Sequence, residues 1–167
     1  FLSAYAFGGN SLEVGTSIVT DGVWNVYVTG YYGDYTDFNP DTGTFYLTPK
    51  GNYDVFVCKF DDRYENSLIA VAMGGIGYDK GNSIKVDGEG NVYTTGSFTS
   101  TADFDPGAST LNLTSAGLAD VFISKLDATG KLAWAKTIGG KLDDEGYSSA
   151  IDNIGNEHIA YFAASNN

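Results

Sequence analysis

The sequence feature that most constrains the fold is an internal repeat. The stretch GNVYTTGSFTSTADFDP, residues 90–106, has a counterpart in WNVYVTGYYGDYTDFNP, residues 24–40, in the same register. Glycine pairs recur at Gly8-Gly9, Gly74-Gly75 and Gly139-Gly140, at steps of 66 and then 65 residues. A repeat of this length indicates tandem supersecondary units that stack on one another, because a single unit cannot bury its apolar face alone.

Each repeat unit contains four strand-like segments and no segment with helical periodicity. In the middle unit they read SIKVD, NVYTTGSF, DVFISKLD and LAWAKTIG, rich in Val, Ile, Tyr, Phe and Thr. Turn-forming clusters separate them, such as DGEGN at residues 87–91 and DATGK at residues 127–131. Four antiparallel strands per repeat predict an all-β chain of propeller blades. The alternatives are a β-sandwich, which does not require such a repeat, and a β-solenoid, whose coils are usually shorter.

The repeat predicts a single domain spanning residues 1–167. We expect two full four-stranded blades at residues 8–73 and 74–138, with partial blades at residues 1–7 and 139–167. Such an arc leaves blade flanks and strand edges unpaired, because a closed ring needs about four blades or more. The expected partners are therefore other copies of the chain, assembled as a ring or a filament, or the missing blades of a longer chain.

The same motifs resemble a known family. GGIGYDKGNSIKVDGEGNVYTTGSF, ADFDPG and DVFISKLDATGKLAWAKTIGG are similar, in this order, to the bacterial β-propeller repeat family called SBBP. The resemblance extends over nearly the whole chain, although Trp24 and Asn39 differ from the second copy and the third copy diverges after Asn156. It implies a secreted or surface-displayed propeller, and a fold more than a defined biochemical role.

Composition disfavours several classes of partner. The formal net charge is −12, from 9 basic and 21 acidic side chains, so the chain lacks the Lys/Arg surplus that nucleic acids and anionic membranes attract. No run approaches the roughly 18 apolar residues of a membrane helix, so we expect no membrane insertion. The chain starts at Phe1, which we interpret as a mature or trimmed product. Cys58, the only cysteine, is expected to be a buried apolar side chain.

Acidic residues recur at the turns, and up-and-down connectivity assigns them to the two faces of the blades. One face collects Glu13, Asp37, Asn39, Asp54, Asp79, Asp103, Asp105, Asp120 and Asp144, and the other collects Asp21, Asp61, Asp87, Asp127 and Asp152. The spacing of Asp103 and Asp105 in DFDP suits the chelation of one hard cation, for which Ca²⁺ fits best. Asp37 and Asn39 are the equivalent pair in DFNP. The alternative is turn capping, in which these side chains accept backbone N–H groups.

A tyrosine cluster in the first unit is a candidate glycan site. Tyr31, Tyr32 and Tyr35 lie in GYYGDYTDF, and exposed tyrosines stack on sugar faces. The alternative for these rings is packing between blades. His158, the only histidine, takes the strand position of Tyr27, so we expect a structural side chain there rather than a general base.

The sequence therefore predicts a non-catalytic extracellular propeller-repeat protein, acting as a structural, adhesive or self-assembling module. Its repeated features are those of a fold, and no asymmetric catalytic constellation stands out. The alternative function is a propeller domain that binds calcium or a glycan. The blades are expected to bury Val26, Tyr27, Val28, Phe56, Val92, Tyr93, Phe122 and Trp134.

Overall fold

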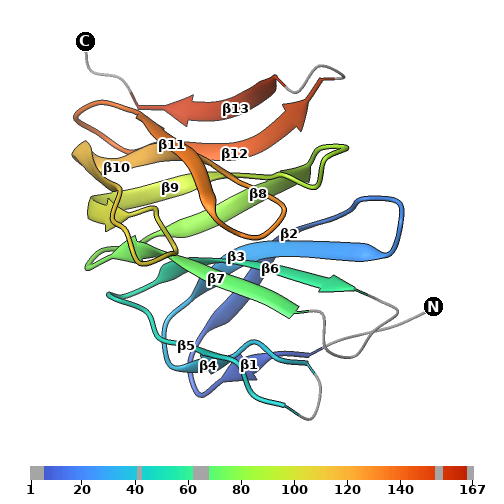
Figure 1. Cartoon of the computed structure of the whole chain (residues 1–167). Helices are drawn as coiled ribbons and strands as arrows, with labels where there is room; N and C mark the ends of the chain where they lie inside the picture. Colours follow the sequence, from blue (N-terminus) through green and yellow to red (C-terminus); the bar gives the residue numbers. More distant parts are fainter. Residues whose placement is uncertain (1–5, 41–42, 62–67, 153–155, 165–167) are drawn as a thin grey trace.

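The computed structural model describes residues 6–40, 43–61, 68–152 and 156–164 (Figure 1). The regular elements within these ranges are all β-strands, which confirms the predicted all-β, propeller-repeat fold class. The strands are β1 (Gly8–Gly9), β2 (Glu13–Thr20), β3 (Asn25–Tyr32), β4 (Thr36–Asp37), β5 (Tyr46–Leu47), β6 (Asp54–Asp61), β7 (Leu68–Gly75), β8 (Lys80–Val86), β9 (Val92–Asp103), β10 (Asn112–Leu126), β11 (Leu132–Ile138), β12 (Asp144–Ile151) and β13 (Glu157–Ala163).

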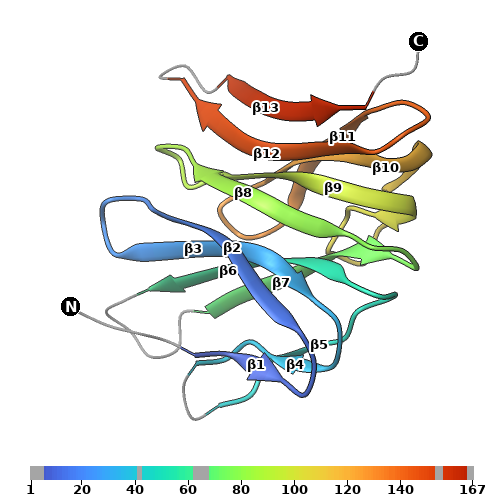
Figure 2. The same ribbon diagram turned by 180° about the vertical axis from the view of Figure 1, so that it is seen from behind.

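The strands form three antiparallel units in chain order. Unit 1 is β2-β3-β6-β7, unit 2 is β8-β9-β10-β11, and unit 3 is the pair β12-β13. Figures 1 and 2 show the units stacked as successive layers, from blue through green to red. Such layering lets each sheet bury one flank against its neighbour, which a single sheet cannot do for itself.

Units 1 and 2 share one internal register. Val26 of β3 pairs with Phe60 of β6, and the residues 66 positions later, Val92 and Leu126, pair with each other. All three first hairpins also carry a bulge just after a glycine, between Gly15 and Ser17, Gly81 and Ser83, and Gly146 and Ser148. The sequence repeat is therefore a repeat of hydrogen-bonded structure, bulges included.

The bulge requires a glycine on the facing strand of units 1 and 2. A Cβ at Gly30 would lie 1.8 Å from the Val14 carbonyl oxygen, and one at Gly96 would lie 1.8 Å from that of Lys80. In unit 3 the facing residue is Tyr161, yet β13 still pairs with β12. The divergent third copy thus keeps its strand pairing without this glycine.

Two pairings go beyond the four-stranded units. Gly8 of β1 pairs with Asp37 of β4, and Gly74 at the end of β7 pairs with Asp103 at the end of β9. Each glycine pair is therefore joined to the acidic turn of the unit that follows it. The two-residue strands β1, β4 and β5 are too short to show an alternating pattern, which explains why the sequence did not predict them.

The larger hydrophobic core lies between units 1 and 2. Its buried side chains include Tyr27 and Val55 from unit 1 and Phe98, Phe122 and Leu126 from unit 2. Burial of each such side chain contributes roughly 1.5–3 kcal/mol. A second cluster on the other flank of unit 1 contains Tyr32, Phe38, Phe56, Cys58, Phe60 and Ala70, with Phe7 packed against it.

Most of the expected core residues are buried. Full burial is seen for Tyr27, Phe56, Val92, Tyr93 and Phe122, and Cys58 is buried as expected. Val26, Val28 and Trp134 are half-buried. The half-buried residues follow from their positions, because Val28 lies on the outer flank of unit 1 and Trp134 lies on the last strand of unit 2.

Polar contacts join the first strands of successive units. Thr16 Oγ1 donates to the Gly81 carbonyl oxygen at 2.6 Å, and the Ile84 amide donates to Ser17 Oγ at 3.3 Å. The next junction repeats both contacts, from Asn82 Nδ2 to Gly146 O at 2.9 Å and from Ser149 N to Ser83 Oγ at 3.2 Å. The stacking of units therefore has a fixed register as well as an apolar core.

The close approach of units at these junctions predicts different stability effects for two equivalent glycine-to-alanine variants. A Cβ at Gly81 would lie 2.4 Å from Thr29 Oγ1, whereas the equivalent Gly15 has only Val28 Cγ1 within 4 Å, at 3.8 Å. We expect Gly81→Ala to lower the free energy of unfolding by about 1–3 kcal/mol through overpacking. Gly15→Ala should change it by less than about 0.5 kcal/mol in the dilute, monomeric chain. Urea denaturation measures both values, and equal losses in the two variants would contradict this account of the junction.

Candidate functional site

The structure divides the acidic side chains into two classes. Some cap turns and accept hydrogen bonds from exposed backbone, and others are buried at the junctions between units. The predicted cation and glycan residues belong mainly to the first class or to the apolar cores. The second class lies on the acidic face that the sequence predicted, but its members are not the residues that the sequence predicted to be cation ligands.

In the second unit, DFDP forms a capped turn. Asp103 Oδ1 accepts the amides of Asp105 and Leu111, both at 3.0 Å, and Asp105 Oδ1 accepts the amide of Gly107 at 2.7 Å. Burial raises the pKa of Asp103, but these amides and the Lys50 ammonium outweigh it and hold the pKa below the usual value. Lys50 Nζ lies 3.0 Å from Asp103 Oδ2 and so ties the unit 1 loop to unit 2.

The first copy of this turn, DFNP, repeats the geometry. Asp37 Oδ1 accepts the amides of Asn39 at 3.0 Å and Phe45 at 2.8 Å. Capping thus accounts for the recurrence of both turns, while cation binding by Asp37, Asn39, Asp103 and Asp105 stays a prediction. Within residues 6–40, 43–61, 68–152 and 156–164, no group of three or more His, Cys, Asp or Glu side chains is placed to hold a metal ion.

The acidic residues on the opposite face cap the first hairpin of each unit. Asp87 Oδ1 accepts the Asn91 amide at 2.9 Å, and its Oδ2 accepts the Tyr93 hydroxyl at 3.1 Å. In unit 3 the equivalent acceptor is Asp152, and His158 Nε2 lies 3.5 Å from its Oδ2. The histidine therefore occupies the place of a tyrosine hydroxyl that binds a capping carboxylate, as its sequence position predicts.

The three tyrosines of the predicted glycan site lie in three different environments. Tyr31 is half-buried, with its ring centroid 5.4 Å from that of Tyr53. Tyr32 is fully buried in the second hydrophobic cluster. Tyr35 is 53% exposed and stacks on Tyr46, with ring centroids 4.2 Å apart and planes 7° apart. The structure thus does not gather the three rings on one surface, and glycan binding stays a prediction.

Two equivalent carboxylate pairs are buried at the junctions. Asp54, the first residue of β6, lies near Asp79, which precedes β8, and Asp120 and Asp144 are their counterparts at the next junction. All four are buried, with 0–3% of their surface exposed. Each pair joins an acid of one unit to an acid of the next, so its charge acts directly on the stacking of units.

Backbone amides hold these carboxylates in place. Asp54 Oδ2 accepts the Lys50 amide at 3.0 Å, and Asp79 Oδ2 accepts the Gly75 amide at 2.7 Å. The close approach requires glycine in the pair that ends β7, because a Cβ at Gly74 would lie 2.4 Å from Asp54 Cγ. The Gly-Gly motif of the repeat is therefore explained by the acids that lie over it.

Burial raises the pKa of Asp54, Asp79 and Asp120. It raises the pKa of Asp54 to about 6, against the opposing effects of the Lys50 amide and charge. It raises the pKa of Asp79 to about 7; the Gly75 amide opposes this rise and the charge of Asp54 adds to it. Burial and the charge of Asp144 likewise raise the pKa of Asp120. Carboxyls with such values are functional candidates, because they change charge near neutral pH.

The sequence contained a signal for these residues. Asp54 and Asp120 both begin an apolar segment, DVFVC and DVFIS, where a charged side chain at the start of a buried strand has to be buried as well. Glu13, at the position equivalent to Asp79, is half-buried. Asp79 is more buried than Glu13 because unit 1 covers it. This burial arises from the stacking of units, so the sequence of a single repeat does not reveal it.

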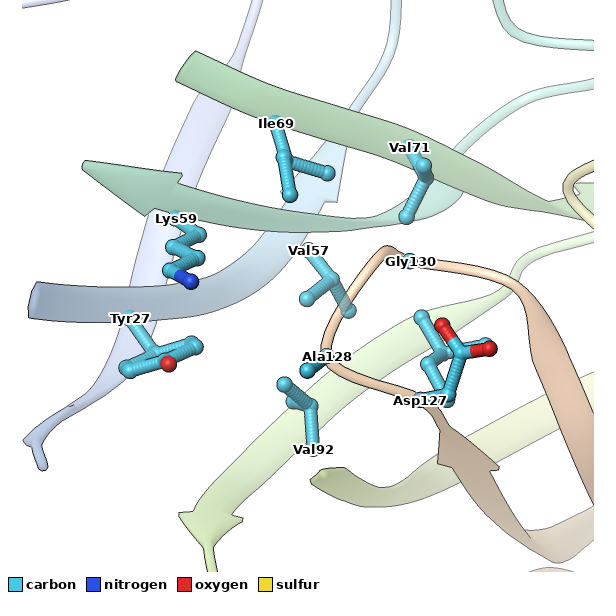
Figure 3. Close-up of a pocket in the computed structure, with 10 residues that line it drawn as sticks. Tyr27, Val57, Lys59, Ile69, Val71, Val92, Asp127, Ala128 and Gly130 are labelled. Atoms are coloured by element: carbon cyan, nitrogen blue, oxygen red, sulfur yellow. The ribbon is translucent and has the colours of Figure 1, made fainter. Parts of the chain in front are cut away.

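A shallow apolar pocket lies at the same junction, toward the opposite end of the strands (Figure 3). Val57 and Val71 of unit 1 face Val92 and Ala128 of unit 2 across it. Its charged groups are Lys59 and Asp127. With few polar groups to orient a ligand, the pocket offers apolar contact only and adds no chemistry to the acidic end.

The raised pKa values predict how stability depends on pH in the metal-free chain. Asp54 and Asp79 keep protons between about pH 4 and pH 7 that the unfolded chain releases, so the free energy of unfolding falls as pH rises through this window. Asp54→Asn keeps an acceptor for the Lys50 amide and removes the charge. We expect it to stabilise the fold by about 1–2 kcal/mol at pH 8 and less at pH 5.

Urea denaturation from pH 5 to pH 8 in the presence of EDTA measures this effect. Asp87→Asn is the control, because hydrogen bonds from Asn91 and neighbouring groups outweigh burial and lower the pKa of Asp87, which places its effect below this window. An Asp54→Asn variant whose pH slope equals that of the parent chain would contradict the prediction.

Comparison with known families agrees with this architecture. The model of the β-propeller repeat family SBBP matches residues 73–105, which span the end of β7, the Gly74-Gly75 pair, β8 and β9. A comparison with curated proteins gives no significant match. The described part of the chain has no helix that is long and apolar enough to cross a membrane. Residues 73–105 of this chain are thus similar to the SBBP β-propeller repeat, in agreement with the resemblance of its motifs.

Proposed function

We propose that the chain is a non-catalytic propeller module that acts by contact, as a structural or adhesive element outside the cell. In this proposal its flanks pack against further blades, supplied by other copies of the chain or by additional propeller repeats. The support comes from pairs of residues that occupy equivalent positions in units 1 and 2 but differ in exposure. In each pair, the buried residue shows how the exposed one would be packed if another unit covered it.

Ile18 is the observation that carries the proposal. Its equivalent one unit later, Ile84, is 0% exposed because unit 1 covers it, whereas Ile18 is 67% exposed. Gly15 is likewise exposed where Gly81 is buried. The outer flank of β2 therefore has the side chains of a covered junction, but no unit in the described part of the chain covers it. Exposed apolar surface of this kind is typical of an interaction site.

The opposite flank of the stack is apolar too. Tyr147 and Phe162 of unit 3 are 56% and 58% exposed. Aromatic side chains of this kind are enriched at protein interfaces, where they bury a large area at small entropic cost. The two flanks together support association at both ends of the stack, as a closed ring or as an open filament.

The non-catalytic part of the proposal rests on the same repeat. The buried junction acids occur as two equivalent pairs, one per junction, whereas a catalytic site usually combines different groups around one substrate. The extracellular location rests on the likeness of the motifs to bacterial propeller repeats. Cell fractionation with an antibody against the chain tests it, and a purely cytosolic signal would contradict it.

Association through the β2 flank predicts the behaviour of two matched variants. We expect the mass of the parent chain, measured by multi-angle light scattering, to rise above 17.7 kDa as its concentration increases. Ile18→Asp should weaken association at least about tenfold, because burial of one isoleucine contributes roughly 1.5–3 kcal/mol. Val23→Asp is the control: Val23 is 61% exposed but lies in the hairpin after β2, so the association should not change.

Circular dichroism and thermal melting at low concentration check that both variants fold. Gly15→Ala, harmless in the dilute chain, should also weaken association, because a covering blade approaches this position as closely as unit 1 approaches Gly81. A parent chain that remains a 17.7 kDa monomer at all concentrations would contradict association between copies. Equal effects of Ile18→Asp and Val23→Asp would contradict the assignment of this flank.

A further inference from the structure

The junction carboxylates each leave one oxygen unsatisfied. Asp54 Oδ2 accepts the Lys50 amide and Asp120 Oδ2 accepts the Ala116 amide, at 3.0 and 2.9 Å. Among the described residues, none gives a hydrogen bond to the buried Oδ1 of either aspartate. A buried carboxylate oxygen without a partner is strongly destabilising. Because the unsatisfied oxygen recurs at two positions 66 residues apart, it belongs to the repeat and not to one local irregularity.

The carboxyl that carries the unsatisfied oxygen lies over the glycine pair that holds the second carboxylate. A Cβ built on Gly74 would lie 2.7 Å from both Asp54 Oδ1 and Asp54 Oδ2, and the amide of the next residue, Gly75, donates to Asp79. The second junction repeats this geometry, with Gly139 against Asp120 Oδ1 at 2.4 Å and the Gly140 amide donating to Asp144 at 2.8 Å. Two carboxylates from different units thus lie over two consecutive glycines at each junction.

We propose that each junction binds one hard divalent cation of the calcium or magnesium class, held by Asp54 and Asp79 at the first junction and by Asp120 and Asp144 at the second. Such ions take oxygen ligands, and carboxylates with a free oxygen are their preferred protein donors. The ion supplies the missing partner of Asp54 Oδ1 and Asp120 Oδ1 and offsets two buried negative charges. It also links one unit to the next. The site goes beyond the proposed contact function and does not depend on it.

The two sites differ in their surroundings. At the first junction the Lys50 ammonium lies nearby, although it pairs with Asp103 at 3.0 Å. At the second junction Ala116 takes the place of Lys50, and Asp143 accepts the Ala119 amide at 3.2 Å close to the pair. The second site therefore carries more net negative charge, and we expect it to bind the cation more tightly.

Calorimetric titration of the full chain with CaCl₂, after removal of metal with EDTA at pH 7.5, tests the proposal directly. We expect saturable binding of about two ions per chain, with the melting temperature raised by about 10–20 °C when the ion is at about one hundred times the Kd of both sites. A parallel titration with MgCl₂ identifies which of the two ions is preferred. Binding should weaken toward pH 5.5, because protons compete for the same carboxylates.

The number of ions bound by each variant shows which carboxylates hold each ion. Asp120→Asn should remove the tighter site and Asp54→Asn the weaker one, each leaving about one ion per chain. Asp103→Asn is the matched control, because an amide oxygen still caps its turn and the stoichiometry should remain about two. Glu13→Gln is a second control, at the position equivalent to Asp79 on the uncovered flank.

Several results would overturn the proposal. No binding heat and no change in melting temperature up to about 10 mM of either ion, in the folded parent chain, would show that the pairs hold protons and not a metal. Loss of binding in Asp103→Asn with retention in Asp54→Asn and Asp120→Asn would move the ion to the acidic turn. The titration measures binding within one chain, so a negative result would contradict the cation sites but not the association between copies. Conversely, a chain that binds two ions and stays monomeric would support the cation sites and contradict the association.

Discussion

The structure depends on the burial of one sheet flank against the next. Unit 2 covers Tyr27 and Val55 of unit 1, and unit 1 in turn covers Ile84 and Gly81 of unit 2. The glycine allows the sheets to approach closely, and the apolar core that this approach creates supplies most of the stabilisation. The polar contacts of Thr16 and Ser17 contribute less energy, but they fix the register of the stack.

The same constraint explains why acids occur where strands begin. The close approach of units brings the loop before β6 onto the Gly-Gly segment before β8, so carboxylates that would otherwise be solvated become buried. At the hairpins on the opposite face, Asp21 and Asp87 remain hydrogen-bonded to amides at the surface. One residue type thus serves as a turn cap where it stays near solvent and as a buried, charge-coupled pair where two units meet.

The sequence predicted the strands, the repeat and the faces of the acids, because alternation and turn residues are local signals. It placed His158 beside a tyrosine position, and the contact with Asp152 confirms the placement. It did not distinguish Asp54 and Asp79 from Asp103 and Asp105, since the difference lies in burial between units. Tyr32 and Tyr35 illustrate the same limit: they are three residues apart in one motif, yet one is in a core and the other is stacked at the surface.

The third unit gives the stack a polarity. Tyr147 stands where Thr16 and Asn82 donate to the glycine carbonyl of the following unit. A neighbour docked there would meet a bulky ring and would need a shape unlike that of units 2 and 3. The outer flank of unit 1 and the outer flank of unit 3 consequently differ in shape, and each would accept a different partner surface.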